Sequence, residues 1–115
     1  MSVKTGSNIV AALKDKGFEV KALEFKSREE LPAFFMGDKP DIVFLGLHGT
    51  FGEDGTVQGY LETLGIPYVG SGVLSSAVCF NKLATQKILK HHKLPIAKFM
   101  EISKESFSIG VILLL

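Results

Sequence analysis

The feature that most constrains the fold is a short apolar run that leads directly into a glycine-rich loop. Residues 41–47 are almost all apolar, and residues 48–55 contain three glycines. A run of this kind is typical of a strand that is covered on both faces, as in a parallel sheet. In open sheets of that class, ligands bind beyond the carboxyl ends of the strands. The run therefore predicts a parallel α/β sheet, and the loop after it is the first candidate for a site.

The rest of the chain alternates between helical and strand-like patterns. We expect helices over residues 7–16, 30–36, 57–64, 73–79 and 82–93, and strands over residues 18–25, 41–47, 66–69 and 96–102. This order predicts an α/β fold, a Rossmann-like three-layer parallel sheet. Because such folds normally open with a strand and the first element here is a helix, we expect the first strand to be missing before Met1.

Composition and charge limit the classes of partner that the chain is expected to bind. The 115 residues suit one domain, and the net charge of +1 points to neither nucleic acid nor a membrane surface. Cys79 is the single cysteine, so an internal disulfide is impossible, and its apolar neighbours predict a place in the core. The apolar tail, residues 109–115, is shorter than the roughly 20 residues that cross a bilayer. It is either a buried strand or a non-native end.

Several side chains after the apolar run could carry chemistry. His48 stands at the strand end, and Glu53 and Asp54 follow within the loop. These carboxylates suit a cation or an ammonium group, although adjacent acids are also common in solvated turns, and no second cluster of ligands indicates a metal. Asp54 or Thr56 is expected to cap the next helix. The residues alone leave two readings open, a ligand site or a turn that only caps the helix.

A second glycine turn and a lysine-rich helix follow. Residues 70–72, Gly-Ser-Gly, resemble a phosphate-binding turn but lack the third glycine of the dinucleotide motif. Five lysines fall within residues 82–98, a pattern typical of a solvated helix. Phosphate binding by Lys82 stays open, and Asn81 is placed to cap this helix.

The motifs also form one ordered series. It runs His-Gly, Gly-Glu-Asp-Gly and Gln-Gly over residues 48–59, Gly-Ile-Pro-Tyr at 65–68, Gly-Ser-Gly at 70–72, Asn-Lys-Leu at 81–83 and Lys-Leu-Pro at 93–95. In order and spacing, residues 40–99 closely resemble the D-alanine–D-alanine ligase family, and residues 2–6 resemble it weakly. The resemblance implies the amino-terminal (pre-ATP-grasp) domain of this family of ATP-grasp ligases.

The resemblance also implies an activity and residue roles. In this family, ATP phosphorylates one D-alanine, and the amine of a second D-alanine displaces the phosphate to give a dipeptide for peptidoglycan. His48, Glu53 and Ser2 would line the first D-alanine subsite, and Lys82 would reach the ATP phosphates. Mg²⁺ or Mn²⁺ bridges those phosphates in the full-length enzyme, but no metal ligand is expected in this chain. The resemblance further implies a bacterial cytoplasmic protein that is a homodimer at full length.

The sequence departs from the family pattern in ways that limit this expectation. Asn81 stands where aspartate is usual, the glutamate of the substrate loop would precede Met1, and nothing recognisable follows about Ser103. We expect residues 1–102 to form the amino-terminal domain and residues 103–115 to begin the next segment or form a non-native tail. The catalytic set is then incomplete. The alternatives are a non-catalytic module for a small carboxylate or phosphate, or an inactive gene remnant.

Overall fold

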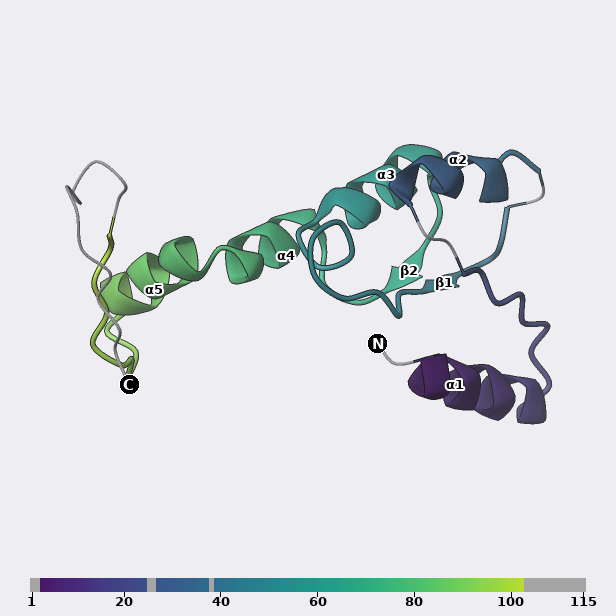
Figure 1. Ribbon diagram of the computed structural model, residues 1–115, viewed down its shortest axis with the longest axis horizontal. Helices are drawn as coiled ribbons and strands as arrows, with labels where there is room; N and C mark the ends of the chain where they lie inside the picture. Colours follow the sequence, from purple (N-terminus) through teal and green to yellow (C-terminus); the bar gives the residue numbers. More distant parts are fainter. Residues whose placement is uncertain (1–2, 25–26, 38, 103–115) are drawn as a thin grey trace.

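The computed structural model describes residues 3–24, 27–37 and 39–102 (Figure 1). The described elements are, in chain order, α1 (Val3–Asp15), the 3-10 helix η1 (Arg28–Glu30), α2 (Leu31–Phe34), β1 (Val43–Phe44), α3 (Thr56–Leu64), β2 (Tyr68–Val69), α4 (Val73–Phe80) and α5 (Lys82–His91). The two strands form a parallel sheet in which Val43 pairs with Tyr68 and Phe44 with Val69. The chain therefore has the predicted α/β content with a small parallel sheet.

The helices lie close to where the periodic patterns predicted them. Gly17 and Gly65 follow α1 and α3 with φ values of +86° and +67°, the left-handed conformation that commonly ends a helix. Pro32 stands in the first turn of α2, where a backbone N–H has no partner within the helix, so proline costs no helical hydrogen bond there. Asn81 caps α5, because its side-chain oxygen accepts a hydrogen bond from the N–H of Ala84 at 3.0 Å.

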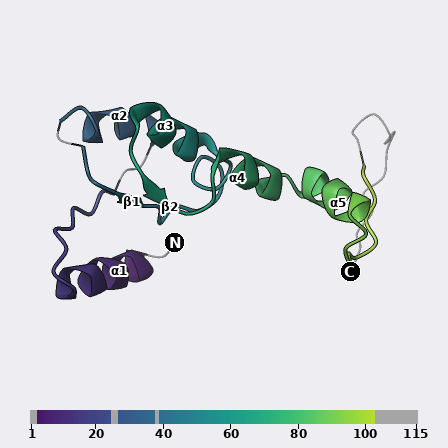
Figure 2. The same cartoon turned by 180° about the vertical axis from the view of Figure 1, so that it is seen from behind.

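The core lies where α2 and α3 pack on one side of the small sheet (Figures 1 and 2). Its buried apolar side chains are Leu31, Phe35, Val57, Leu61 and Ile66. Side chains from the strand region, including Val43, Leu45 and Tyr68, pack against this cluster. The apolar face of α3, spaced at i, i+3 and i+4, is thus directed into the core as its pattern predicted.

The strand predictions are only partly correct. The strand expected over residues 41–47 is limited to Val43–Phe44, and Ile42 and Phe44 are 59% and 51% exposed, so its predicted cover on both faces is wrong. Residues 18–24 and 96–102 form no strand. The strands expected over residues 96–102 and over the described part of residues 18–25 are therefore also wrong. A strand forms only when a neighbour accepts its backbone hydrogen bonds, and alternation alone does not supply that neighbour. The three-layer sheet stays a prediction, and residues 103–115 lie outside the described residues.

The two ends of the described chain extend away from this core. We call α4 and α5 together, residues 73–91, the arm; it leads away from the sheet in both views (Figures 1 and 2). Helix α1 lies apart from the core on the other side of the sheet. The radius of gyration is 18.8 Å, well above the about 13 Å of a compact domain of this length. Much of the apolar surface of the arm is consequently open.

Candidate functional site

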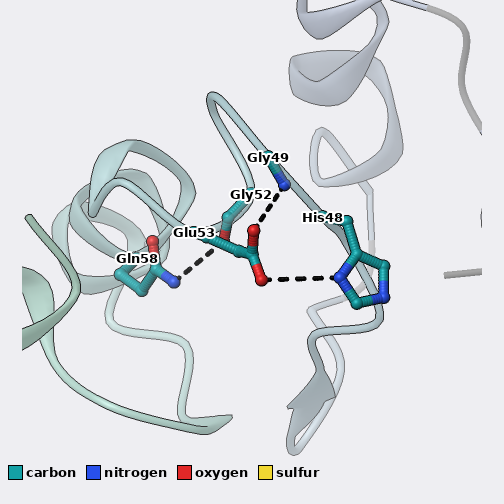
Figure 3. A network of polar contacts seen from close by, with 5 residues as sticks. All are labelled: His48, Gly49, Gly52, Glu53 and Gln58. Atoms are coloured by element: carbon teal, nitrogen blue, oxygen red, sulfur yellow. Dashed lines mark hydrogen bonds and ion pairs between the residues drawn. The ribbon is translucent and has the colours of Figure 1, made fainter. Parts of the chain in front are cut away.

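Glu53 lies in the loop between β1 and α3, where neighbouring groups hold its carboxylate (Figure 3). Its Oε2 accepts a hydrogen bond from the N–H of Gly49 at 2.6 Å, and its Oε1 lies 3.4 Å from Nδ1 of His48. Its own N–H donates to the carbonyl of Gly49 at 2.9 Å. The side chains of His48 and Glu53 remain 60% and 50% exposed. The pair is therefore fixed in place yet open to a ligand.

Asp54 accepts two backbone hydrogen bonds within the same loop. Its Oδ2 accepts from the N–H of Phe51 at 2.7 Å, and its Oδ1 accepts from the N–H of Thr56 at 3.0 Å. The bond from Phe51, followed by those from Thr56, lowers the pKa of Asp54 below its ordinary value of 3.8. The N-cap of α3 is Gly55, so the predicted cap by Asp54 or Thr56 is wrong by one residue. Asp54 shapes the loop and leaves Glu53 as the acid open to ligands.

The backbone of the loop is strained, and local contacts maintain it. Phe51 has a φ of +77°, a conformation uncommon for any residue but glycine, and its ring packs against the core. At Gly52 a Cβ atom would lie 2.5 Å from Cβ of Leu47, so no larger residue fits without movement of the chain. The close approach to Leu47 explains why glycine stands at the first position of the Gly-Glu-Asp-Gly motif.

Gln58 joins the loop to the core. It is only 5% exposed, and its Nε2 donates to the carbonyl of Gly52 at 3.0 Å (Figure 3). Gln58 belongs to the Gln-Gly pair of the ordered motifs, but no role was predicted for it. The signal was available, because a polar residue between Val57 and Leu61 falls on the face of α3 that the apolar pattern assigns to the core. A buried polar side chain needs a hydrogen-bond partner, and the loop supplies one.

An open hollow of about 470 Å³ brings the predicted residues together. Its lining includes His48, Glu53 and Lys82, which come from the loop and from the first residue of α5. The turn at Gly70–Ser71 and the α4 residues Ser75 and Ser76 also border it. The hollow therefore combines an acid, an imidazole and an ammonium group with a glycine turn at the start of a helix.

Cys79 was predicted to lie in the core, and this is wrong, because it is exposed and borders the hollow. Helix α4 is apolar on most sides but buries only Ser76, so its composition could not identify the covered face. Ser2, predicted to contact substrate, lies outside the described residues.

The other possible sites among the described residues carry fewer kinds of ionisable side chain. A second hollow, of about 390 Å³, is lined by Lys90, Ile96, Ala97, Lys98 and Phe99, without an acid or a histidine. Within residues 3–24, 27–37 and 39–102, no three His, Cys, Asp or Glu side chains gather as metal ligands would. None of the described helices has the length and apolar character that a bilayer crossing requires.

Comparison with known proteins gives this geometry a context. The family model described as "D-ala D-ala ligase N-terminus" matches residues 27–71. The D-alanine–D-alanine ligase of Desulforudis audaxviator (strain MP104C) is 42% identical over 102 residues, which are 89% of this chain and 33% of that protein. That of Aquifex aeolicus (strain VF5) is 49% identical over 90 residues, 78% of this chain and 30% of that protein. The chain spans about a third of the length of such curated relatives.

A solved structure has the same arrangement of elements. The D-alanine–D-alanine ligase from Bacillus anthracis, crystallised in complex with ATP, superimposes with a TM-score of 0.82 at 36% identity. The match covers 94% of this chain and 35% of that one. Because nearly the whole chain is included, its extended arrangement of elements matches that part of the larger protein.

Proposed function

Since this chain matches the amino-terminal region of the D-alanine–D-alanine ligases, we propose that it supplies the first D-alanine subsite of such an ATP-dependent ligase. His48 and Glu53 are the proposed contacts to D-alanine, with Ser2 as a further contact. The proposed product is the D-alanyl-D-alanine dipeptide for peptidoglycan. The observation that carries the proposal is the Glu53 carboxylate, fixed by Gly49 and His48 at the edge of an open hollow.

The chemistry of D-alanine supports this assignment. A free amino acid carries an ammonium group, so its site needs an acceptor of negative charge. The half-exposed Glu53 carboxylate on the hollow offers one. Charge-assisted hydrogen bonds are stronger than neutral ones, and preformed geometry lowers the cost of making them. We assign Lys82 to a phosphate of ATP, next to the glycine turn at residues 70–72.

The metal and most of the nucleotide site are not expected from this chain. Mg²⁺ or Mn²⁺ would neutralise the phosphate charge in the complete enzyme. The described residues gather no set of three metal-ligating side chains, so by themselves they do not fit a metal site. In the complete enzyme we propose a cytoplasmic homodimer, with this region as part of a three-layer sheet.

The chain alone is expected to bind but not to catalyse. Catalysis requires the reacting groups to be held together, and the hollow holds only a few of them. We expect no release of phosphate from ATP and D-alanine above that of the triple variant with His48, Glu53 and Lys82 changed to alanine. A phosphate assay that finds turnover abolished by the triple substitution would contradict this.

Binding is tested on the same chain by nuclear magnetic resonance. D-alanine is expected to shift the amide signals of the loop, residues 48–53, and L-alanine at equal concentration to shift them less. Glu53→Gln should weaken the response, because it removes the charge while keeping the shape. Glu62→Gln, an acid outside the hollow, is the matched control and should leave the response unchanged. Equal responses to both enantiomers, or an undiminished response in Glu53→Gln, would count against the proposed subsite.

A simple anion-binding module is the second candidate. It is favoured by Lys82 and the Gly70–Ser71 turn, which border the same hollow. It predicts that inorganic phosphate alone shifts the amides of residues 70–73, with D-alanine having no effect at the loop. Lys82→Ala should abolish that phosphate response, whereas Lys90→Ala should not.

A further inference from the structure

The Gly52–Glu53 peptide group is held from both of its ends. Its carbonyl, on Gly52, accepts the hydrogen bond from Nε2 of Gln58 at 3.0 Å. Its N–H, on Glu53, donates to the carbonyl of Gly49 at 2.9 Å. A planar peptide group with its carbonyl and its N–H both bonded cannot rotate without breaking one of them. The direction in which the Glu53 side chain leaves the backbone is thereby set.

The cost of burying Gln58 indicates that its side chain has a task. Its Oε1 is buried with no hydrogen-bond partner among the residues that the structure describes. An unpaired buried carbonyl destabilises the folded state, and an apolar side chain of the same shape would avoid this. For the core alone, an apolar residue between Val57 and Leu61 would serve better. An apolar residue could not provide the hydrogen bond to the carbonyl of Gly52.

We propose that Gln58 is a positioning residue, whose amide fixes the Gly52–Glu53 peptide group and so aims the Glu53 carboxylate at Gly49 and His48. The close approach of Gly52 to Leu47 fixes the other side of the same backbone. Gln58 thus connects the buried face of α3 to an exposed carboxylate through one peptide group. The inference rests on the proposed function for the task of Glu53, but its geometry can be tested without any ligand.

The test uses the amide of Gly49 as a reporter, because its N–H donates to the Glu53 carboxylate at 2.6 Å. In Gln58→Met, we expect its hydrogen exchange to accelerate by about tenfold, the effect of losing one hydrogen bond. The chemical shift that Glu53→Gln causes at Gly49 in the parent chain should largely vanish in the Gln58→Met background, as coupled residues require. The midpoint of urea unfolding should change little, because the unpaired Oε1 is removed while the Gly52 carbonyl loses its donor.

Gln86→Met is the matched control. Gln86 also has a buried Oε1 without a described partner, but it lies in α5 rather than beneath the loop. It should leave the exchange of Gly49 and its response to Glu53→Gln unchanged. If Gln58→Met does not fold, Gln58→Asn replaces it, because its amide is one methylene too short to reach Gly52.

The possible results distinguish a positioning role of Gln58 from a structural one. A Gly49 signal unaffected by the Gln58 variant, or affected equally by Gln86→Met, would overturn the positioning role. A merely structural glutamine would leave the Gly49 response to Glu53→Gln intact, whatever its effect on the urea midpoint. Failure of D-alanine to bind would contradict the proposed function alone, because the reporter is measured without ligand.

Discussion

The region from Leu31 to Ile66 and the arm, residues 73–91, bury apolar side chains to very different extents. The first contains every buried hydrophobic side chain of the described chain, with Leu61 at 0% and Val57 at 1% exposure. In the arm, Leu74 is 77% exposed and the one buried side chain is Ser76. The first region is therefore stabilised by tertiary burial. The arm depends more on its own helical hydrogen bonds, its cap, the contact between its two helices and the contact of α4 with α3.

The largest expected effect comes from making the same substitution in both regions. Leu61→Ala removes a fully buried side chain and should lower the free energy of unfolding by about 3 kcal/mol. Leu74→Ala, also within a helix, should change it by less than about 0.5 kcal/mol. Urea unfolding monitored by circular dichroism compares the two. Equal losses would mean that the arm is packed in solution, and the contrast between the regions would be lost.

The same contrast explains what could be predicted from the sequence. The positions of the helices followed from local signals, such as Gly65 after α3 and Asn81 before α5, because caps and periodicity act over a few residues. The extent of β1 and the exposure of Cys79 depended on which distant surfaces come together, and local composition does not encode that.

For the site, the ordered motifs identified His48, Glu53 and Lys82, and the structure brings all three to one hollow. Their roles stay predictions. A role for Gln58 was not predicted, because it depends on a tertiary hydrogen bond to Gly52. Periodicity could mark the position as buried, but it could not indicate which loop group the amide would meet.

A second prediction concerns the junction between the regions. Gly55 has a φ of +92°, and a Cβ there would lie 2.8 Å from the carbonyl oxygen of Val73, at the start of the arm. Gly55→Ala should therefore destabilise the chain by about 2 kcal/mol through backbone strain. Gly37→Ala is the control, because a Cβ there meets nothing within 4 Å. If both variants unfold at the same urea concentration, the close approach of the loop to α4 does not exist in solution.

A smaller effect should be confined to the arm. Asn81→Ala removes the acceptor for the N–H of Ala84 and should cost α5 about 1 kcal/mol. Hydrogen exchange should accelerate in residues 84–91 while α3 is unaffected, because the arm has little burial to couple it to the core. Asn81→Asp keeps an acceptor at the helix N-terminus and should retain the protection of α5. Faster exchange in α3 as well would indicate that the two regions unfold together.

The smallest expected effect is a pH dependence of folding stability, which we assign to Asp54 in the loop. Hydrogen bonds from Phe51 and Thr56 lower the pKa of Asp54 below 3.8 in the folded chain. A lowered carboxyl pKa stabilises the fold above the unfolded value, and this contribution is lost as pH falls below about 4 towards the folded pKa. Because Asp54 is close to solvent, the change should be smaller than that caused by Asn81→Ala.

Asp54→Asn tests this assignment, since it keeps one acceptor oxygen but cannot ionise. Its urea midpoint should lie below that of the parent chain at pH 7, and the two should converge as pH falls below about 4. Asp15→Asn, at the end of α1 and away from the loop, should keep the parent's pH dependence. A parallel pH dependence in Asp54→Asn would mean that another carboxylate carries the effect. The loop would then be held by its backbone contacts and Gln58 more than by the charge of Asp54.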